Sequence, residues 1–139
     1  MILVDTGPLV ALFDPRDPDH DSMVSTLKRV AEGLVTTVPV LTEAFHLLRP
    51  ASRGSNALRE FIVREGMGTW FLSKTGLARA FALMERYADH PMDLADASLV
   101  AAAEALRTTV VLTLDRGDFA TYRARIGRSH RSFRILNPG

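Results

Sequence analysis

The sequence has no cysteine, few aromatic residues and no excess of either charge. The absence of cysteine from its 139 residues excludes disulfides, thiolate zinc sites and cysteine nucleophiles, and is typical of a reducing compartment such as the cytoplasm. Any metal ion therefore has to be held by oxygen or histidine ligands. The 17 basic and 16 acidic residues give a formal net charge of +1, so no overall field indicates a nucleic acid, a membrane or an acidic partner.

Long hydrophobic runs and internal repeats are also missing. The longest charge-free stretches, such as 33–42, are far shorter than the roughly 20 apolar residues of a membrane-spanning helix, and no basic signal segment opens the chain. We therefore expect a cytoplasmic protein without an anchor. Since no low-complexity linker divides the chain, residues 1–139 are expected to form a single domain.

Short apolar strands alternate with helices along the chain. Strands are predicted at residues 2–4, 34–37, 69–72, 110–114 and 133–136, and helices at 8–13, 23–30, 40–48, 56–65, 75–88, 93–107 and 119–123, with a loop at 51–55. The strands are continuously apolar, which indicates a parallel sheet that is covered on both faces. The predicted fold is an α/β class, three-layer α/β/α sandwich with a central, mainly parallel sheet of four to five strands.

Acidic residues follow the predicted strands at the edge where ligands bind in such folds. Asp5 ends the first strand, Glu43 lies in the first turns after the second, Asp93 and Asp96 open the helix before the fourth, and Asp115 ends the fourth. We expect all five carboxylates to point to one edge of the sheet.

Each aspartate also has an ordinary structural explanation. Asp5 can cap the next helix, Asp93 and Asp96 can be first-turn residues favoured by the helix dipole, and Asp115 can start a turn. The sequence leaves both interpretations open for these four residues.

Glu43 is harder to explain as a surface residue. Val40, Glu43, Ala44 and Leu47 follow the spacing of one helix face, so we expect the carboxylate to interrupt an apolar stripe. The helix is apolar nearly all round, which weakens this inference.

Several carboxylates in one pocket need a counterion, because a pair ~4 Å apart costs about 4 kcal/mol at an effective dielectric constant near 20. Oxygen ligands without cysteine or paired histidine indicate Mg²⁺ or Mn²⁺ rather than zinc. Such an ion lowers the pKa of a bound water and neutralises a phosphoryl oxygen. The pattern therefore indicates metal-dependent hydrolysis at phosphorus.

Four segments in order carry a resemblance to a known family: residues 2–9, Glu43 after Pro39, 92–100 and 112–119. With these spacings the whole chain resembles PIN-domain proteins, specifically VapC-type toxins of type II toxin–antitoxin pairs. The resemblance implies an α/β/α fold, a Mg²⁺- or Mn²⁺-dependent endoribonuclease acting on RNA, frequent homodimerisation, and inhibition by a small VapB-type antitoxin.

The resemblance also assigns residues. By it, the catalytic and metal-binding acids are Asp5, Glu43, Asp96 and Asp115. Asp93 lies one turn before Asp96, and Asp118 also matches the fourth acid, so these two are supporting candidates. Thr6 and Thr113 stand beside acids, where a hydroxyl can orient a carboxylate or a metal-bound water; an ordinary turn or strand hydroxyl fits equally well.

Arginine accounts for fifteen of the seventeen basic residues, and many lie in the last quarter. Guanidinium groups suit phosphate, so RNA contacts are predicted for Arg116, Arg123, Arg125 and Arg128. A solvated or antitoxin-facing surface explains this group equally well. The four histidines lack ligand spacing, and none is assigned to a metal.

Two other functions compete. The Asp5-Thr6-Gly7 triplet after an apolar strand also resembles retroviral-type aspartic proteases, whose fold is almost wholly β. A catalytically inactive PIN-like module that binds RNA or a protein is the second alternative. A dimer surface is expected near 23–30 or near 77–84.

Overall fold

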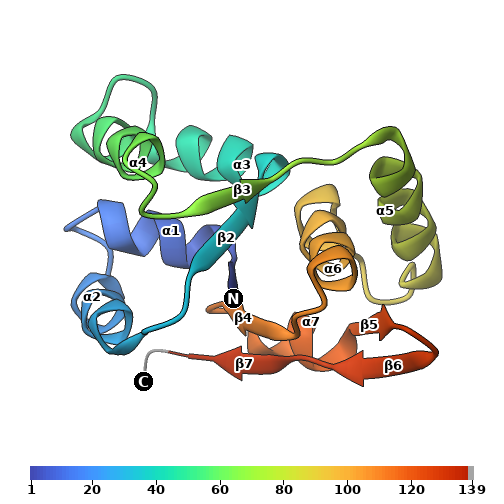
Figure 1. The fold of residues 1–139 in the computed structure, drawn as a ribbon. Helices are drawn as coiled ribbons and strands as arrows, with labels where there is room; N and C mark the ends of the chain where they lie inside the picture. The colour runs from blue at the N-terminus through green and yellow to red at the C-terminus, as the bar shows by residue number, and fades with distance from the viewer. Residues whose placement is uncertain (138–139) are drawn as a thin grey trace.

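Five parallel strands form the central sheet of the computed structural model, which describes residues 1–137 (Figure 1). Across the sheet they lie in the order β3 (Gly68–Trp70), β2 (Leu34–Thr37), β1 (Ile2–Val4), β4 (Val110–Leu112) and β7 (Arg134–Leu136), and every neighbouring pair is parallel. The predicted sheet is confirmed, and it excludes the almost wholly β fold of the aspartic proteases. Residues 138 and 139 of the predicted domain lie outside the described residues.

Helices cover both faces of the sheet. They are α1 (Thr6–Phe13), α2 (His20–Arg29), α3 (Val38–Leu48), α4 (Arg53–Val63), α5 (Lys74–Arg86), α6 (Leu94–Leu106) and α7 (Arg116–Thr121). Figure 1 shows α1, α2 and α4 on one side and α5 and α6 on the other, which confirms the three layers. Within residues 1–137, no helix combines the length and the apolar character needed to cross a membrane.

Capping side chains define where most helices begin. Hydrogen bonds from backbone N–H groups of the first turn are accepted by Asp5, Thr37, Ser52, Ser73, Asp93 and Asp115. The cap at Ser52 starts α4 at Arg53, although the sequence predicted a loop over 51–55. Three of the six caps are aspartates from the predicted acidic set: the cap at Asp5 was predicted, whereas Asp93 precedes the first turn of α6 instead of lying in it, and Asp115 caps α7 instead of only starting a turn.

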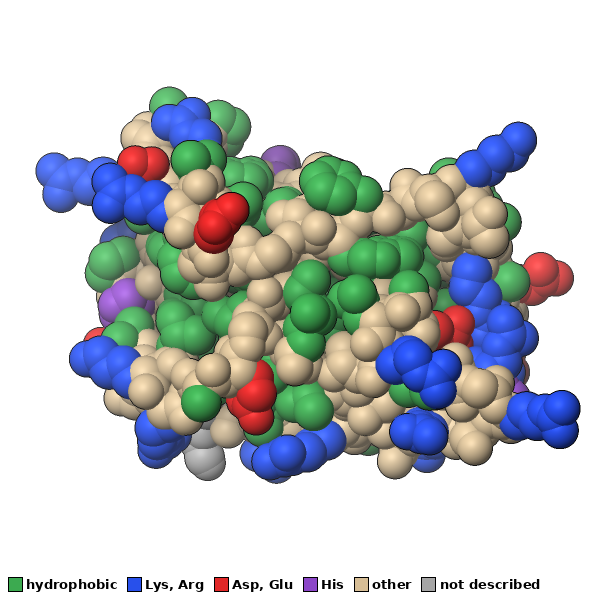
Figure 2. Space-filling model, viewed as in Figure 1, with side chains coloured by type: hydrophobic (Ala, Val, Ile, Leu, Met, Phe, Trp, Pro, Cys, Tyr) green, Lys and Arg blue, Asp and Glu red, His purple; other side chains and the backbone are tan. Residues whose placement is uncertain are grey.

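The basic segment near the C-terminus forms a hairpin that the sequence reasoning missed. Strand β5 (Arg123–Ile126) pairs antiparallel with β6 (Ser129–Ser132), and Gly127 adopts the positive φ of 62° that the turn requires. Ala124 and Ile126 are buried while Arg125 is exposed, so the alternation was present in the sequence. Figure 2 shows Lys and Arg side chains at the right of this face, over the hairpin and α5, and others at the left, over α2 and α4.

Candidate active site

Asp5 lies at the end of β1, where two hydrogen bonds hold its carboxylate. Its Oδ1 accepts from the backbone N–H of Thr6 at 2.8 Å, and the Thr113 hydroxyl donates to Oδ2 at 2.8 Å. Burial raises the pKa of Asp5 against the lowering effect of these hydrogen bonds, and the charges of Asp93 and Glu43 raise it further. The same carboxylate therefore caps α1 and lies within the field of other acids.

Glu43 reaches this edge from α3. The Thr6 hydroxyl donates to Glu43 Oε1 at 2.8 Å. The expected apolar stripe is wrong, because Val40 and Ala44 are buried whereas Glu43 is exposed and Leu47 is 60% exposed. Glu43 therefore lies on the open side of α3, next to the residue that follows Asp5.

Asp93 and Asp96 differ in environment although they are one turn apart. Asp93 is the exposed N-cap of α6, and its Oδ1 accepts from the backbone N–H of Asp96 at 2.8 Å. Asp96 is partly buried, and the Tyr122 hydroxyl donates to its Oδ2 at 3.3 Å. Burial, followed by the charges of Asp93, Asp5 and Asp118, raises the pKa of Asp96 to about 8. Burial and the neighbouring carboxylates therefore both make the charged form of Asp96 unfavourable.

Asp115 completes the group after β4. It caps α7 by accepting from the backbone N–H of Asp118 at 3.1 Å, and its own N–H donates to the Thr113 hydroxyl at 3.0 Å. One hydroxyl thus joins Asp115 to Asp5. A hydrogen bond with the Asp118 side chain lowers the pKa of Asp115, while burial and this same bond raise the pKa of Asp118. His90 Nε2 lies 2.6 Å from Asp118 Oδ1.

Four segments of the chain therefore bring Asp5, Glu43, Asp96 and Asp115 to one edge. Among residues 1–137, no three acids or histidines already surround a common point in ligating geometry. The donor set is nevertheless the all-oxygen type that hard divalent cations prefer. The raised pKa of Asp96 shows that full ionisation is unfavourable without added positive charge. In donor type and charge, these residues fit a divalent metal ion.

The sequence of this chain is similar to those of known proteins. The family model described as PIN domain matches residues 2–124. The chain belongs to the PIN-domain family. Ribonuclease VapC26 of Mycobacterium tuberculosis is 32% identical to it over 126 residues, covering 88% of this chain and 92% of that protein. The chain is accordingly a VapC-type PIN domain.

Solved structures share the fold of this PIN domain. The crystal structure of Mycobacterium tuberculosis VapC20, described as a toxin that cleaves the sarcin–ricin loop, superposes with a TM-score of 0.77 at 19% identity, covering 84% of this chain and 92% of that one. A toxin–antitoxin complex from Klebsiella pneumoniae gives a TM-score of 0.66 at 18% identity, covering 100% and 98% of the two chains.

Two side chains around the acids of this PIN domain were missed by the sequence reasoning. Tyr122 fell in a predicted helix, and His90 was set aside because the histidines lack ligand spacing. Tyr122 is fully buried, and its ring meets that of His90 edge to face at 5.8 Å. No local pattern marks them, because Tyr122 is 26 residues from Asp96 and His90 is 28 residues from Asp118.

Tyr122→Phe is expected to weaken Mn²⁺ binding by roughly 10- to 100-fold, which is typical when a group that orients a metal ligand is lost. The change removes the hydroxyl that holds Asp96 and retains the buried ring. Isothermal titration calorimetry with Mn²⁺ measures the affinity. Tyr87→Phe is the matched control, since the Tyr87 hydroxyl accepts from the backbone of Arg123 and its ring packs on Tyr122. Unchanged affinity in Tyr122→Phe would contradict the prediction.

The arginines predicted to contact RNA lie along a path that leads away from the acids. They are Arg116, Arg123, Arg125 and Arg128. Arg116 directly follows Asp115, whereas the Arg123 guanidinium donates to backbone carbonyls at the end of α7. The Arg125 backbone N–H bonds to Glu104, which lies eight residues after Asp96 on α6, about 12 Å along the helix axis. Only Arg116 is thus next to an acid of the cluster in the chain.

Proposed function

We propose that this PIN domain is an endoribonuclease that hydrolyses RNA phosphodiester bonds, with Asp5, Glu43, Asp96 and Asp115 as its catalytic and metal-binding residues. The convergence of these carboxylates at one edge of the sheet carries the proposal, because the raised pKa of Asp96 marks a site that favours a cation. The 32% identity to a protein named as a ribonuclease supports RNA as the substrate.

PIN-domain ribonucleases generally depend on divalent metal ions, and we propose Mg²⁺ or Mn²⁺ here. When bound, the ion supplies a water of lowered pKa and neutralises charge on a phosphoryl oxygen. The protein's part is to hold the ligands. The Thr113 hydroxyl donates to the Asp5 carboxylate and accepts from the Asp115 backbone N–H, and the Thr6 hydroxyl donates to the Glu43 carboxylate. Supporting roles are accordingly proposed for Thr6, Thr113, Asp93 and Asp118.

Purified protein is expected to cut RNA in Mg²⁺ or Mn²⁺ and to lose this activity in EDTA. The assay uses a mixed cellular RNA pool with sequencing of the cut ends, so it reports both activity and target. Excess Mn²⁺ added after EDTA is the control, and it should restore the same ends. Cleavage that persists undiminished in EDTA would contradict the metal site. RNA binding without cleavage would indicate an inactive module instead.

We also propose that the nuclease acts as the toxin of a toxin–antitoxin pair, with a small VapB-type antitoxin as its partner. Support comes from the VapC relative and from the same fold in the Klebsiella pneumoniae toxin–antitoxin complex. RNA contact remains proposed for the four arginines, with Arg116 the best placed. Because β1 and β7 belong to one sheet, we propose that residues 1–139 act as one nuclease domain.

A homodimer is part of the same proposal. Of the two predicted dimer surfaces, the one around residues 23–30 is less well supported, because Met23 is fully buried within the monomer. On the other, Phe81 is 54% exposed, and Phe71 nearby in the chain is 69% exposed. Aromatic residues are enriched in protein–protein interfaces, which supports this surface for the homodimer.

A further inference from the structure

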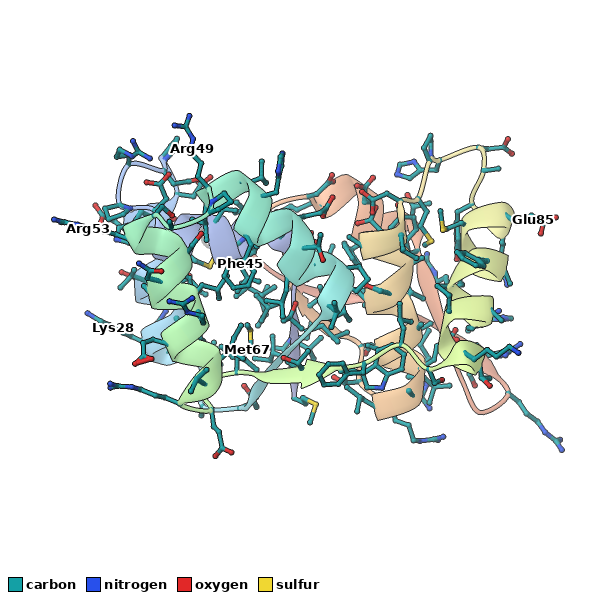
Figure 3. All side chains as sticks on the ribbon, turned by 90° about the horizontal axis from the view of Figure 1, so that it is seen from above. Lys28, Phe45, Arg49, Arg53, Met67 and Glu85 are labelled. Atoms are coloured by element: carbon teal, nitrogen blue, oxygen red, sulfur yellow. The ribbon has the colours of Figure 1, made fainter. Side chains whose placement is uncertain are left out.

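A cavity of about 430 Å³ lies between the first turns of α3 and α6. These helices contact each other and lie side by side in Figure 3. Val38, Pro39 and Leu94 supply apolar walls, and Thr42, Glu43 and Asp93 supply the polar groups. The volume falls in the range of small-ligand sites, roughly 300–1,000 Å³.

The position of the cavity links it to the acid cluster. Glu43 and Asp93 line the cavity, and their charges also raise the pKa of Asp5. In RNA, a base and the adjacent phosphate are joined through a single ribose. A phosphodiester at the acids therefore brings a neighbouring base within reach of the cavity.

The polar groups of the cavity are hydrogen-bond acceptors. Thr42 donates its hydroxyl proton to the Val38 carbonyl at 3.0 Å, so its oxygen offers lone pairs. Carboxylate oxygens accept hydrogen bonds, and Glu43 and Asp93 each have a second oxygen besides the one bonded to Thr6 or to the Asp96 backbone. The lining residues that the structure describes include no Lys, Arg or His. Such walls suit a flat, uncharged ring whose edge carries N–H donors, and they disfavour phosphate.

We propose that this cavity binds the nucleobase adjacent to the cleaved phosphodiester and that it prefers guanine, whose N1–H and N2–H₂ groups face the acceptors. Unpaired bases are commonly recognised in this way, by apolar contact with the ring and hydrogen bonds to the edge. The inference rests on the proposed ribonuclease function and adds a base preference to it.

Binding of defined oligonucleotides to the Asp96→Asn protein tests the proposal without requiring cleavage. The probes are fluorescein-labelled uridine 11-mers with one central guanosine, inosine or abasic residue, measured by fluorescence anisotropy in Mg²⁺. Removing the base is expected to weaken binding by roughly 5- to 100-fold, the range for one well-packed base. Inosine, which lacks the N2 amino group, is expected to fall between the two. Less than a twofold difference among the three probes would overturn the proposal.

Two substitutions on α3 locate the effect. Val38 is 41% exposed inside the cavity, whereas Leu47 is 60% exposed on the same helix and outside it. Val38→Ser is expected to reduce the ratio of guanosine to abasic affinity several-fold, while Leu47→Ser should preserve it. Equal ratios in the two variants would overturn the proposal. So would a change in oligomeric state, measured by light scattering, in Val38→Ser alone, because the cavity would then be a contact between copies.

Cleavage of the same probes by the wild-type protein separates the two proposals. Guanosine-dependent binding without cleavage would leave the base site standing and remove the ribonuclease. Cleavage together with no dependence on the guanosine in either assay would support the ribonuclease and overturn the base site.

Discussion

Asp96→Asn is expected to abolish RNA cleavage, by roughly 10³-fold or more, and at the same time to raise the Tm of the metal-free protein. Cleavage should be lost because the proposed metal site loses a carboxylate. Stability rises because the asparagine oxygen can still accept from Tyr122, while its NH₂ group can donate to the neighbouring carboxylates. A gain of roughly 2–5 °C corresponds to about 1 kcal/mol in a domain of this size.

The raised pKa of Asp96 also predicts how the Tm difference between Asp96→Asn and the wild type changes with pH. The pKa of Asp96 is about 8 in the folded protein against an ordinary value of 3.8. The destabilisation of the wild-type fold by this carboxyl group is therefore absent below pH 4 and grows until pH 8. In EDTA, the Tm of the variant should therefore exceed the Tm of the wild type by an amount that increases from pH 5 to pH 8. Saturating Mn²⁺ should stabilise the wild type more than the variant and narrow this difference in Tm.

Asp21→Asn is the matched control, because Asp21 is an exposed aspartate on α2. It should leave both cleavage and the pH dependence of Tm unchanged. A lower Tm for Asp96→Asn in EDTA at pH 8, or cleavage close to that of the wild type, would contradict the role assigned to Asp96.

Asp5→Asn is expected to cause a loss of cleavage of similar size with little change in Tm. Asparagine caps helices about as well as aspartate, so α1 should start normally. Its amide cannot accept from both Thr6 and Thr113, which costs about 1 kcal/mol. Removing a buried carboxylate of raised pKa offsets this cost.

Circular dichroism and thermal unfolding beside the RNA assay check the Asp5 prediction. Full cleavage by Asp5→Asn would remove this residue from the site. A large fall in Tm together with lost cleavage would show that the carboxylate is needed for folding, through its hydrogen bonds with both Thr6 and Thr113, and would contradict the prediction. The two variants are therefore most informative when measured side by side.

The edge of the sheet where the acids gather was predictable from the sequence. Asp5 and Asp115 follow apolar strands, and parallel strands end at the same edge, so their proximity needs only the strand pattern. The choice between Asp93 and Asp96 was not predictable by the same reasoning, because a helix cap and a buried carboxylate have the same local spacing. The Tyr122 hydroxyl and the surrounding burial distinguish them. Glu43 was predicted as a site residue by its position after the second strand and by the family resemblance. The apolar stripe that was added as support does not exist, since α3 turns Val40 and Ala44 inward and leaves Glu43 open.

The sequence by itself determined the α/β class, the parallel sheet and the edge at which Asp5 and Asp115 lie, and it predicts that any metal ion is held by oxygen ligands. These follow from composition and from patterns that extend over a few residues. The tertiary structure alone decided that burial raises the pKa of Asp5 and Asp96, that Tyr122 and His90 join the cluster, that the arginine-rich hairpin runs away from it, and that a cavity opens between α3 and α6. Each of these depends on burial and on contacts between residues far apart in the chain, which no local pattern records.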